Sequence, residues 1–254
     1  MRPARLSVVL VAHGSRDPRG AAATSALARA VRRSRPAWDV HVAYLDHAGP
    51  RPLDVLASLP GRRAVVVPLL LTKAYHGRVD IPAVLAAASD LPITVTLADV
   101  LGPAASFPAP EVPSLLLDGL VRRLRACGPS GAVSALDAVV LAAAGTRDPA
   151  ARATVEWAAD ALSARLSLPC AVAYASAAPP LPGAAVDLLR ASGARRIGVA
   201  SYFLAPGYLY DLAARSALEA GAVAVAEPLS DAPELARLVA VRVDESLLSV
   251  SAAA

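Results

Sequence analysis

The sequence has 254 residues, of which 56% are hydrophobic and 18% are charged, so it suits one large or two ordinary domains and excludes a disordered chain. The formal net charge is +4, but no basic run carries interleaved aromatic residues, so we expect no nucleic-acid partner. Apolar runs such as 64–71 are too short for a membrane span of roughly 18 residues, and no leader pattern opens the sequence, so we expect a cytoplasmic protein without membrane partners.

Short apolar runs of strand length alternate with segments of helical length along the sequence. In the first half, we expect strands at 6–12, 39–45, 64–71 and 92–97 and helices at 20–35, 51–59, 79–89 and 111–126. This alternation is typical of β-α-β units, in which helices cover both faces of a parallel sheet.

The second half shows the same alternation after a turn-rich stretch at 128–131. Its expected strands span 137–142, 170–175, 196–202 and 222–226, with helices between them and a last helix at 232–248. We therefore predict an α/β protein of two similar tandem domains, residues 1–129 and 130–254. Each domain is expected to hold a parallel four-stranded sheet flanked by helices, with an active-site cleft between the domains.

The two halves repeat one another in three separate blocks, which indicates an internal duplication. The first block reads Val-Ala-His-Gly-Ser-Arg-Asp-Pro in one half and Ala-Ala-Ala-Gly-Thr-Arg-Asp-Pro in the other. The matched blocks, separated by nearly the same number of residues, are 11–18 with 142–149, 42–44 with 172–174, and 71–76 with 204–209.

Two histidines distinguish the first copy from the second. His13 follows the first expected strand and is replaced by Ala144, whereas the glycine, arginine, aspartate and proline of the turn are kept. His76 follows the third expected strand and is replaced by Leu209. Because the turns do not need these imidazoles, we predict that both histidines are functional. Both lie beyond the carboxyl ends of strands, where open parallel sheets bind their ligands.

Asp46 and His47 follow the second expected strand and so belong to the same edge of the sheet. The second copy has Ser176 and Ala177 in these positions. Asp46 could accept a proton or help to hold a metal ion. An ordinary polar loop explains Asp46 as well as a functional role does, and explains His47 better.

Arginines flank the two histidines and are candidates for binding carboxylates. They are Arg16, Arg19 and Arg78. Arg147 repeats Arg16 in the second copy, so Arg16 has a partly architectural interpretation, and a plain surface charge remains the alternative for Arg78.

Two imidazoles with one carboxylate form an open, incomplete set of ligands for Fe²⁺, Co²⁺ or Ni²⁺. The segments that carry the histidines are Leu-Val-Ala-His-Gly-Ser-Arg-Asp-Pro at 10–18 and Val-Val-Pro-Leu-Leu-Leu-Thr-Lys-Ala-Tyr-His-Gly-Arg-Val-Asp-Ile-Pro at 66–82. They resemble the two signature stretches of the sirohydrochlorin cobalt- and ferrochelatases. The long members of that family are tandem duplications with the active histidines in the first half, so the resemblance covers the whole chain.

The resemblance implies a lyase-type chelatase that inserts Fe²⁺ or Co²⁺, with Ni²⁺ as a further candidate, into sirohydrochlorin. It implies that His13 and His76 are catalytic residues and metal ligands, and that Asp46 takes the place of a glutamate usual in the family. The residues expected to bind the acidic tetrapyrrole are Ser15, Arg16, Tyr75 and Arg78. The metal is a substrate, so we expect no permanently bound cofactor, and we expect a monomer.

Two other functions remain open from the residues. A metal or tetrapyrrole carrier without turnover would use the same ligands as a chelatase. A histidine phosphatase is a remote alternative, because its chemistry needs an arginine directly before the histidine, where this sequence has Ala12.

Overall fold

The computed structural model describes residues 5–72, 80–105, 109–127 and 133–252. The chain forms two compact units, Met1–Leu101 with Asp231–Ala254, and Gly102–Ser230. Each unit holds a four-stranded, all-parallel sheet flanked by helices, which confirms the predicted fold class. In the described ranges, no helix has the length and apolar character that crossing a membrane requires.

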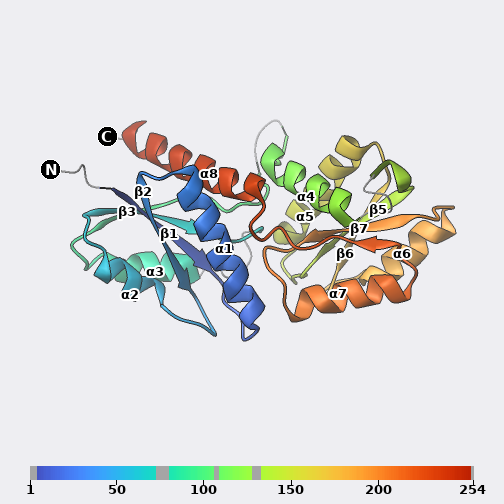
Figure 1. Ribbon diagram of the computed structural model, residues 1–254, viewed down its shortest axis with the longest axis horizontal. Helices are drawn as coiled ribbons and strands as arrows, with labels where there is room; N and C mark the ends of the chain where they lie inside the picture. The colour runs from blue at the N-terminus through green and yellow to red at the C-terminus, as the bar shows by residue number, and fades with distance from the viewer. Residues whose placement is uncertain (1–4, 73–79, 106–108, 128–132, 253–254) are drawn as a thin grey trace. The chain divides into compact units, whose positions relative to one another are not determined.

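The first unit is built around a sheet with the strand order β2-β1-β3-β4 (Figure 1). Its elements are β1 (Leu6–Ala12), α1 (Pro18–Ser34), β2 (Trp38–Tyr44), α2 (Pro52–Ser58), β3 (Arg63–Pro68), α3 (Ile81–Ala88), β4 (Thr94–Leu97) and α8 (Pro233–Ala252). The central strands β1 and β3 are almost wholly buried, as their continuous apolar sequences predict. The strand order reverses between β1 and β3, so the connections that follow these strands flank the point where such sheets bind ligands.

Helices cover both faces of this sheet. α2 and α3 contact one another on one face, where alternate residues of the central strands, such as Val9 and Val66, join a buried apolar cluster with Leu56 and Ile81. α1 and α8 contact one another, and α8 also contacts β3 and β4 (Figure 1). The amphipathic helices thus bury their apolar sides against a sheet that has no polar face.

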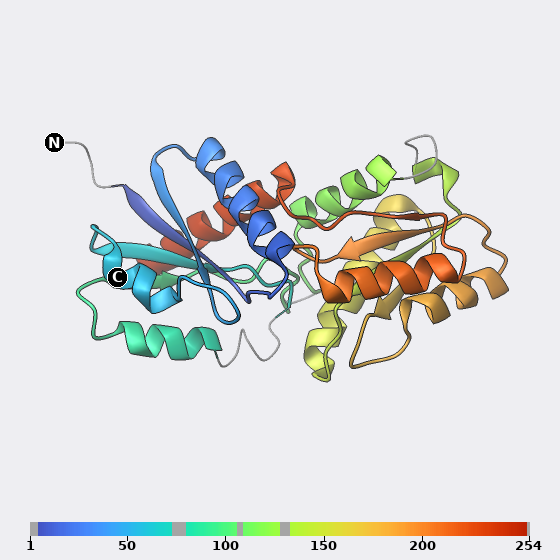
Figure 2. The ribbon, with the colours of Figure 1, turned by 60° about the horizontal axis from the view of Figure 1, so that its bottom comes forward.

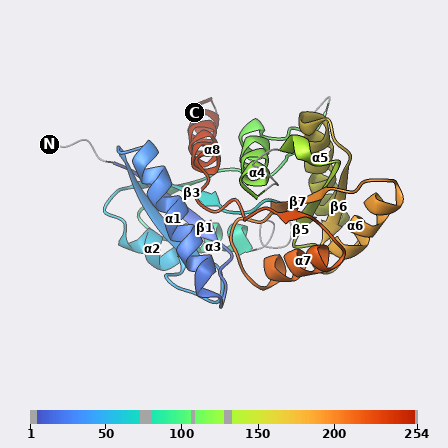
Figure 3. The same cartoon turned by 45° about the vertical axis from the view of Figure 1, so that its right-hand side comes forward.

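The second unit repeats this plan with the strand order β6-β5-β7-β8. Its elements are α4 (Ser114–Cys127), the 3-10 turn η3 (Val133–Ala135), β5 (Ala138–Ala143), α5 (Pro149–Leu166), β6 (Cys170–Tyr174), α6 (Pro182–Ala191), β7 (Ile197–Tyr202), α7 (Tyr208–Glu219) and β8 (Ala224–Val225). α6 and α7 lie side by side in orange (Figure 2), and α4 lies beside α5 (Figure 3).

The compact units differ from the expected division at residue 129 because each takes the last helix of the other sequence repeat. α4 precedes residue 129 but contacts β7 and β8 of the second unit. α8 ends the chain but packs in the first unit, where the Arg242 Nε atom donates a hydrogen bond to the Val100 carbonyl at 2.9 Å. The apolar pattern of each helix does not by itself indicate which sheet the helix covers, and tertiary packing decides between them.

Candidate functional site

The connection between β1 and α1 begins with His13 and turns at Gly14. Gly14 has a φ of +97°, and a β-carbon at this position would lie 1.8 Å from the carbonyl oxygen of Asp46. Only glycine accommodates both the left-handed backbone and this close approach. The tight turn therefore brings the backbone of His13 against the loop that follows β2.

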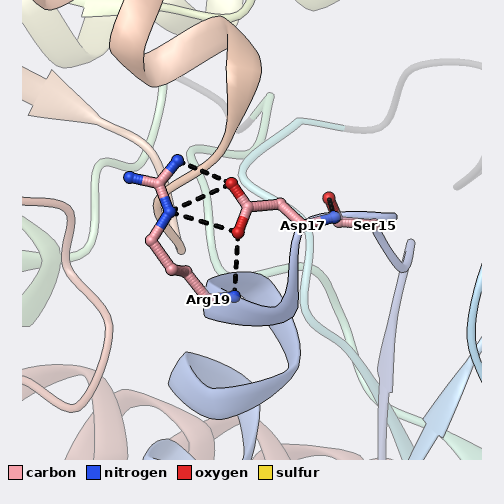
Figure 4. A network of polar contacts seen from close by, with 3 residues as sticks. All are labelled: Ser15, Asp17 and Arg19. Carbon is pink, nitrogen blue, oxygen red and sulfur yellow. Dashed lines mark hydrogen bonds and ion pairs between the residues drawn. The ribbon is translucent and has the colours of Figure 1, made fainter.

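Polar side chains close the turn and start α1 (Figure 4). The Ser15 hydroxyl accepts a hydrogen bond from the Asp17 N–H at 3.0 Å, and the Asp17 carboxylate accepts one from the Arg19 N–H at 2.9 Å. The Arg19 guanidinium also binds the Asp17 carboxylate, with an N–O distance of 2.6 Å, and this pairing lowers the pKa of Asp17. Asp17 is thus the N-cap of α1, with Pro18 as the first helical residue.

The loop after β2 places Asp46 and His47 beside His13. The Asp46 N–H donates to the His13 carbonyl at 2.8 Å, so the two loops are joined through their backbones. The rings of His13 and His47 meet edge to face, with centroids 6.0 Å apart and an interplanar angle of 77°. His13 is half-buried, whereas Asp46 is exposed. The structure thus brings together His13, which follows β1, and Asp46, which follows β2.

The carboxylate of Asp46 is turned toward His47. Its Oδ1 accepts a hydrogen bond from the His47 backbone N–H at 2.7 Å, and its Oδ2 lies 3.5 Å from the His47 Nε2. The backbone hydrogen bond lowers the pKa of Asp46, and the charges of His47, Arg51 and His13 act in the same direction. Asp46 is therefore an anion at neutral pH, available to attract a cation or to orient an imidazole.

The second unit has the same two loops without these side chains. Gly145 has a φ of +96°, and a β-carbon there would lie 1.9 Å from the carbonyl oxygen of Ser176. The Ser176 N–H donates to the Ala144 carbonyl at 3.1 Å, and Asp148 caps the following helix. The shared backbone geometry shows that the loops form without the imidazole of His13 or the carboxylate of Asp46.

Three of the predicted site residues, Tyr75, His76 and Arg78, lie outside the described residues. By sequence they belong to the connection between β3 and α3. Within the described ranges, no group of three or more His, Cys, Asp or Glu side chains is placed to hold a metal ion.

Two predicted substrate-binding residues lie in the turn after His13. The Ser15 hydroxyl accepts the backbone hydrogen bond already described, and Thr146 accepts the equivalent bond from Asp148 at 3.1 Å in the second unit. That bond is therefore part of the turn in both units. Arg16 is exposed, as is its counterpart Arg147.

From the sequence, an ordinary polar loop explains His47 better than a functional role does. The structure shows that it contacts both His13 and Asp46. Its replacement by Ala177 in the second copy is the same signal that identified His13, and could have singled it out.

The first unit also contains a pocket of about 560 Å³, to which the loop after β2 contributes Pro50. It lies at the free edge of β2, between α1 and α2, and its lining includes Arg29, Arg32, His41 and Asp54. Arg32 Nε donates to the Val40 carbonyl at 3.0 Å, so this guanidinium covers part of the strand edge. None of the predicted site residues lines this pocket.

Comparisons with solved structures found proteins of similar fold. The structure is similar to SirB from Bacillus subtilis with Fe³⁺, with a TM-score of 0.77, 19% identity and 96% of each chain covered. For SirB of subspecies spizizenii in complex with cobalt, the TM-score is 0.74, with 19% identity and coverage of 96% of this chain and 95% of that one. For CbiX, the terminal enzyme for biosynthesis of siroheme in denitrifying bacteria, the TM-score is 0.65, with 19% identity and coverage of 95% of this chain and 99% of that one.

At these identities, the structural similarity establishes a common fold. The comparison with curated protein sequences found no match. The CbiX family model matches residues 7–109 and again residues 138–246, so it spans most of the chain and both copies of the repeat. The chain therefore belongs to the CbiX family.

Proposed function

We propose that this protein is a lyase-type chelatase that inserts Fe²⁺ or Co²⁺ into sirohydrochlorin. The observation that carries the proposal is the comparison of the two units. The equivalent loops of the two units have the same backbone conformation. Only the first unit has an imidazole and a carboxylate at these positions, in His13 and Asp46. Membership of the CbiX family and the likeness to SirB and CbiX support this choice of reaction.

The proposed chemistry exchanges one divalent metal ion for the two N–H protons of the macrocycle. His13 and His76 present the metal ion through neutral imidazole nitrogens, which suit borderline transition metals. The same nitrogens can accept the released protons near neutral pH, because free histidine has a pKa of about 6.5. Asp46, an anion beside His13, raises the local attraction for the metal cation.

The carboxylates of the tetrapyrrole need cationic and hydrogen-bonding partners. Arg16 is exposed next to the first loop and, with Arg78, is proposed to pair with substrate carboxylates. Ser15 and Tyr75 are proposed to add hydrogen bonds from their hydroxyl groups. The formal net charge of +4 favours approach of such an acidic substrate.

The test is an anaerobic assay of sirohydrochlorin with Fe²⁺, Co²⁺ or Ni²⁺, followed by the loss of the free-base absorption spectrum. We expect many metallated rings per protein molecule, which separates a chelatase from a carrier that stops at one equivalent. His13→Ala and His76→Ala should each reduce the rate at least about 100-fold, the scale of a lost acid–base group. Arg147→Ala, at the position that repeats Arg16, should keep the wild-type rate.

Two results would contradict the proposal. If none of the three metals is inserted faster with protein than without it, the chain is not a sirohydrochlorin chelatase. If both histidine variants keep the full rate, the reaction takes place elsewhere.

A further inference from the structure

His47 contacts both functional groups of the described loops. Its ring packs edge to face against the ring of His13, with centroids 6.0 Å apart. Its backbone N–H donates to Asp46 Oδ1 at 2.7 Å, and its Nε2 lies 3.5 Å from Asp46 Oδ2. One residue thus contacts both the imidazole and the carboxylate that the proposed reaction uses.

The backbone of His47 is left-handed, with a φ of 58°. The equivalent Ala177 has a φ of 65°, and each loop closes with the same hydrogen bond, from Ala48 to Asp46 at 2.7 Å and from Ala178 to Ser176 at 2.8 Å. A side chain no larger than a methyl group therefore supports this loop. The imidazole of His47 is not needed to form the loop, and its contacts with His13 and Asp46 call for another explanation.

A histidine that presents a metal ion must hold its ring in one orientation, because the nitrogen lone pair lies in the ring plane. Outer partners that fix a histidine ring commonly change metal affinity by about 10–100-fold. Edge-to-face packing against a second ring provides such a restraint, and a 77° interplanar angle is the arrangement that aromatic pairs favour.

We propose that His47 is a positioning residue, whose ring holds the imidazole of His13 in the orientation that receives a divalent transition metal, while its backbone N–H holds the carboxylate of Asp46. This inference rests on the proposed function for the role of His13. It predicts that ring shape at residue 47 matters, whereas the nitrogen atoms of that ring do not bind the metal.

Three variants separate these properties. His47→Phe keeps an aromatic ring but removes its nitrogens. His47→Asn suits the left-handed backbone but removes the ring. Ala177→Asn makes the matched change at the equivalent position of the second unit, where no imidazole stands in the neighbouring loop.

The first measurement is NMR of the metal-free protein, in which the imidazole C–H signals of His13 are identified by their loss in His13→Ala. In wild-type protein and His47→Phe, these signals should be displaced by the neighbouring ring. In His47→Asn, they should lose this displacement. Ala177→Asn should leave them unchanged.

The second measurement is the dissociation constant for Co²⁺ without any tetrapyrrole. His47→Asn should weaken binding at least about 10-fold. His47→Phe should stay within about threefold of wild type, because the restraint on His13 persists. An equal loss in His47→Phe and His47→Asn would mean that the His47 ring itself binds the ion, and this would overturn a positioning role. Unchanged His13 signals and Co²⁺ affinity in His47→Asn would also overturn it.

Neither measurement requires metal insertion. If the predicted NMR and Co²⁺ results are obtained but sirohydrochlorin is not metallated, the proposed function fails and the positioning of His13 stands. If sirohydrochlorin is metallated at an unchanged rate by His47→Asn, with unchanged His13 signals, the proposed function stands and the role of His47 fails.

Discussion

The backbone N–H of Asp46 donates a hydrogen bond to the carbonyl oxygen of His13, over 2.8 Å. This bond joins the loops that follow two neighbouring parallel strands, β1 and β2, at the residues that carry the imidazole and the carboxylate. Because both partners are backbone atoms, the juxtaposition depends on the turn at Gly14 rather than on the two side chains. The second unit makes the equivalent bond between Ser176 and Ala144.

The first prediction concerns that turn. Gly14→Ala should lower the free energy of unfolding by at least roughly 1–3 kcal/mol, the cost of holding a non-glycine residue in a disfavoured backbone region. The close approach of the new β-carbon to the Asp46 carbonyl, 1.8 Å without relaxation, should add to this cost and separate His13 from Asp46. Denaturant unfolding and the Co²⁺ dissociation constant measure the two effects.

Gly145→Ala is the matched control for this change. A β-carbon at Gly145 would meet the Ser176 carbonyl at 1.9 Å, so a similar loss of stability is expected in the second unit. Co²⁺ binding should not change, because Ala144 and Ser176 stand in those loops at the positions of His13 and Asp46. Equal loss of Co²⁺ binding in both variants would contradict the assignment of the site to the first unit.

The second prediction concerns α8, which ends the second sequence repeat but belongs to the first unit. A fragment of residues 1–129 lacks α8, whose buried residues include Leu235, Leu238 and Val239, and it exposes the face of β3 and β4 that α8 covers. We expect it to be unfolded or aggregated, because it leaves a large apolar surface in water. Residues 1–101 joined by a flexible linker to residues 231–254 should fold, as judged by amide dispersion in NMR. A well-folded 1–129 fragment would contradict this division.

The third prediction concerns acid stability. The Asp137 carboxylate accepts hydrogen bonds from the Arg196 side chain at 2.8 Å and from the backbone N–H groups of Arg196 and Arg195 at 2.9 and 3.0 Å. These contacts, with the Arg196 side chain first, lower the pKa of Asp137 to about 2. The unfolded chain has a pKa near the ordinary value of about 3.9. The contribution of Asp137 to stability is therefore complete above pH ~4 and is lost as the pH falls toward ~2.

Thermal unfolding of wild-type protein and Asp137→Asn from pH 2 to pH 7 checks this dependence. The difference in Tm should be constant at neutral pH and shrink between pH ~4 and ~2. Asp187→Asn, which changes an exposed aspartate on α6, is the control and should show no such change. A difference that stays the same down to pH 2 would contradict the proposed origin of the effect.

The fourth prediction concerns thiol reactivity. Burial raises the pKa of Cys170, at the start of β6, to about 12, and it also raises the pKa of Cys127. The reactive species is the thiolate, so Cys170 should react with a disulfide reagent at pH 8.5 at least about 100-fold more slowly than a free cysteine of pKa about 8.5. Measuring the native and unfolded states of Cys127→Ser isolates Cys170. Equal rates in the two states would contradict the effect of burial.

The local sequence pattern by itself determined the strands, the helices and the candidate site residues. Continuous apolar runs predicted the buried central strands, and the expected and observed first strand both span residues 6–12. The Asp-Pro pairs stand at helix starts because a side-chain cap and a fixed φ act within one turn, and Asp17 and Asp148 cap α1 and α5. The internal repeat made His13 and Asp46 candidates by their replacement in the second copy, and this needed no structure.

Only the tertiary structure decided which sheet each terminal helix covers and what His47 contacts. The apolar side of α4 or α8 does not by itself indicate which sheet the helix covers, so the choice depends on long-range packing such as the hydrogen bond from Arg242 to Val100. The contacts of His47 depend on a left-handed residue and on a neighbouring loop more than 30 positions earlier in the chain. Sequence periodicity records how a segment folds locally, whereas packing between distant segments decides which residues meet.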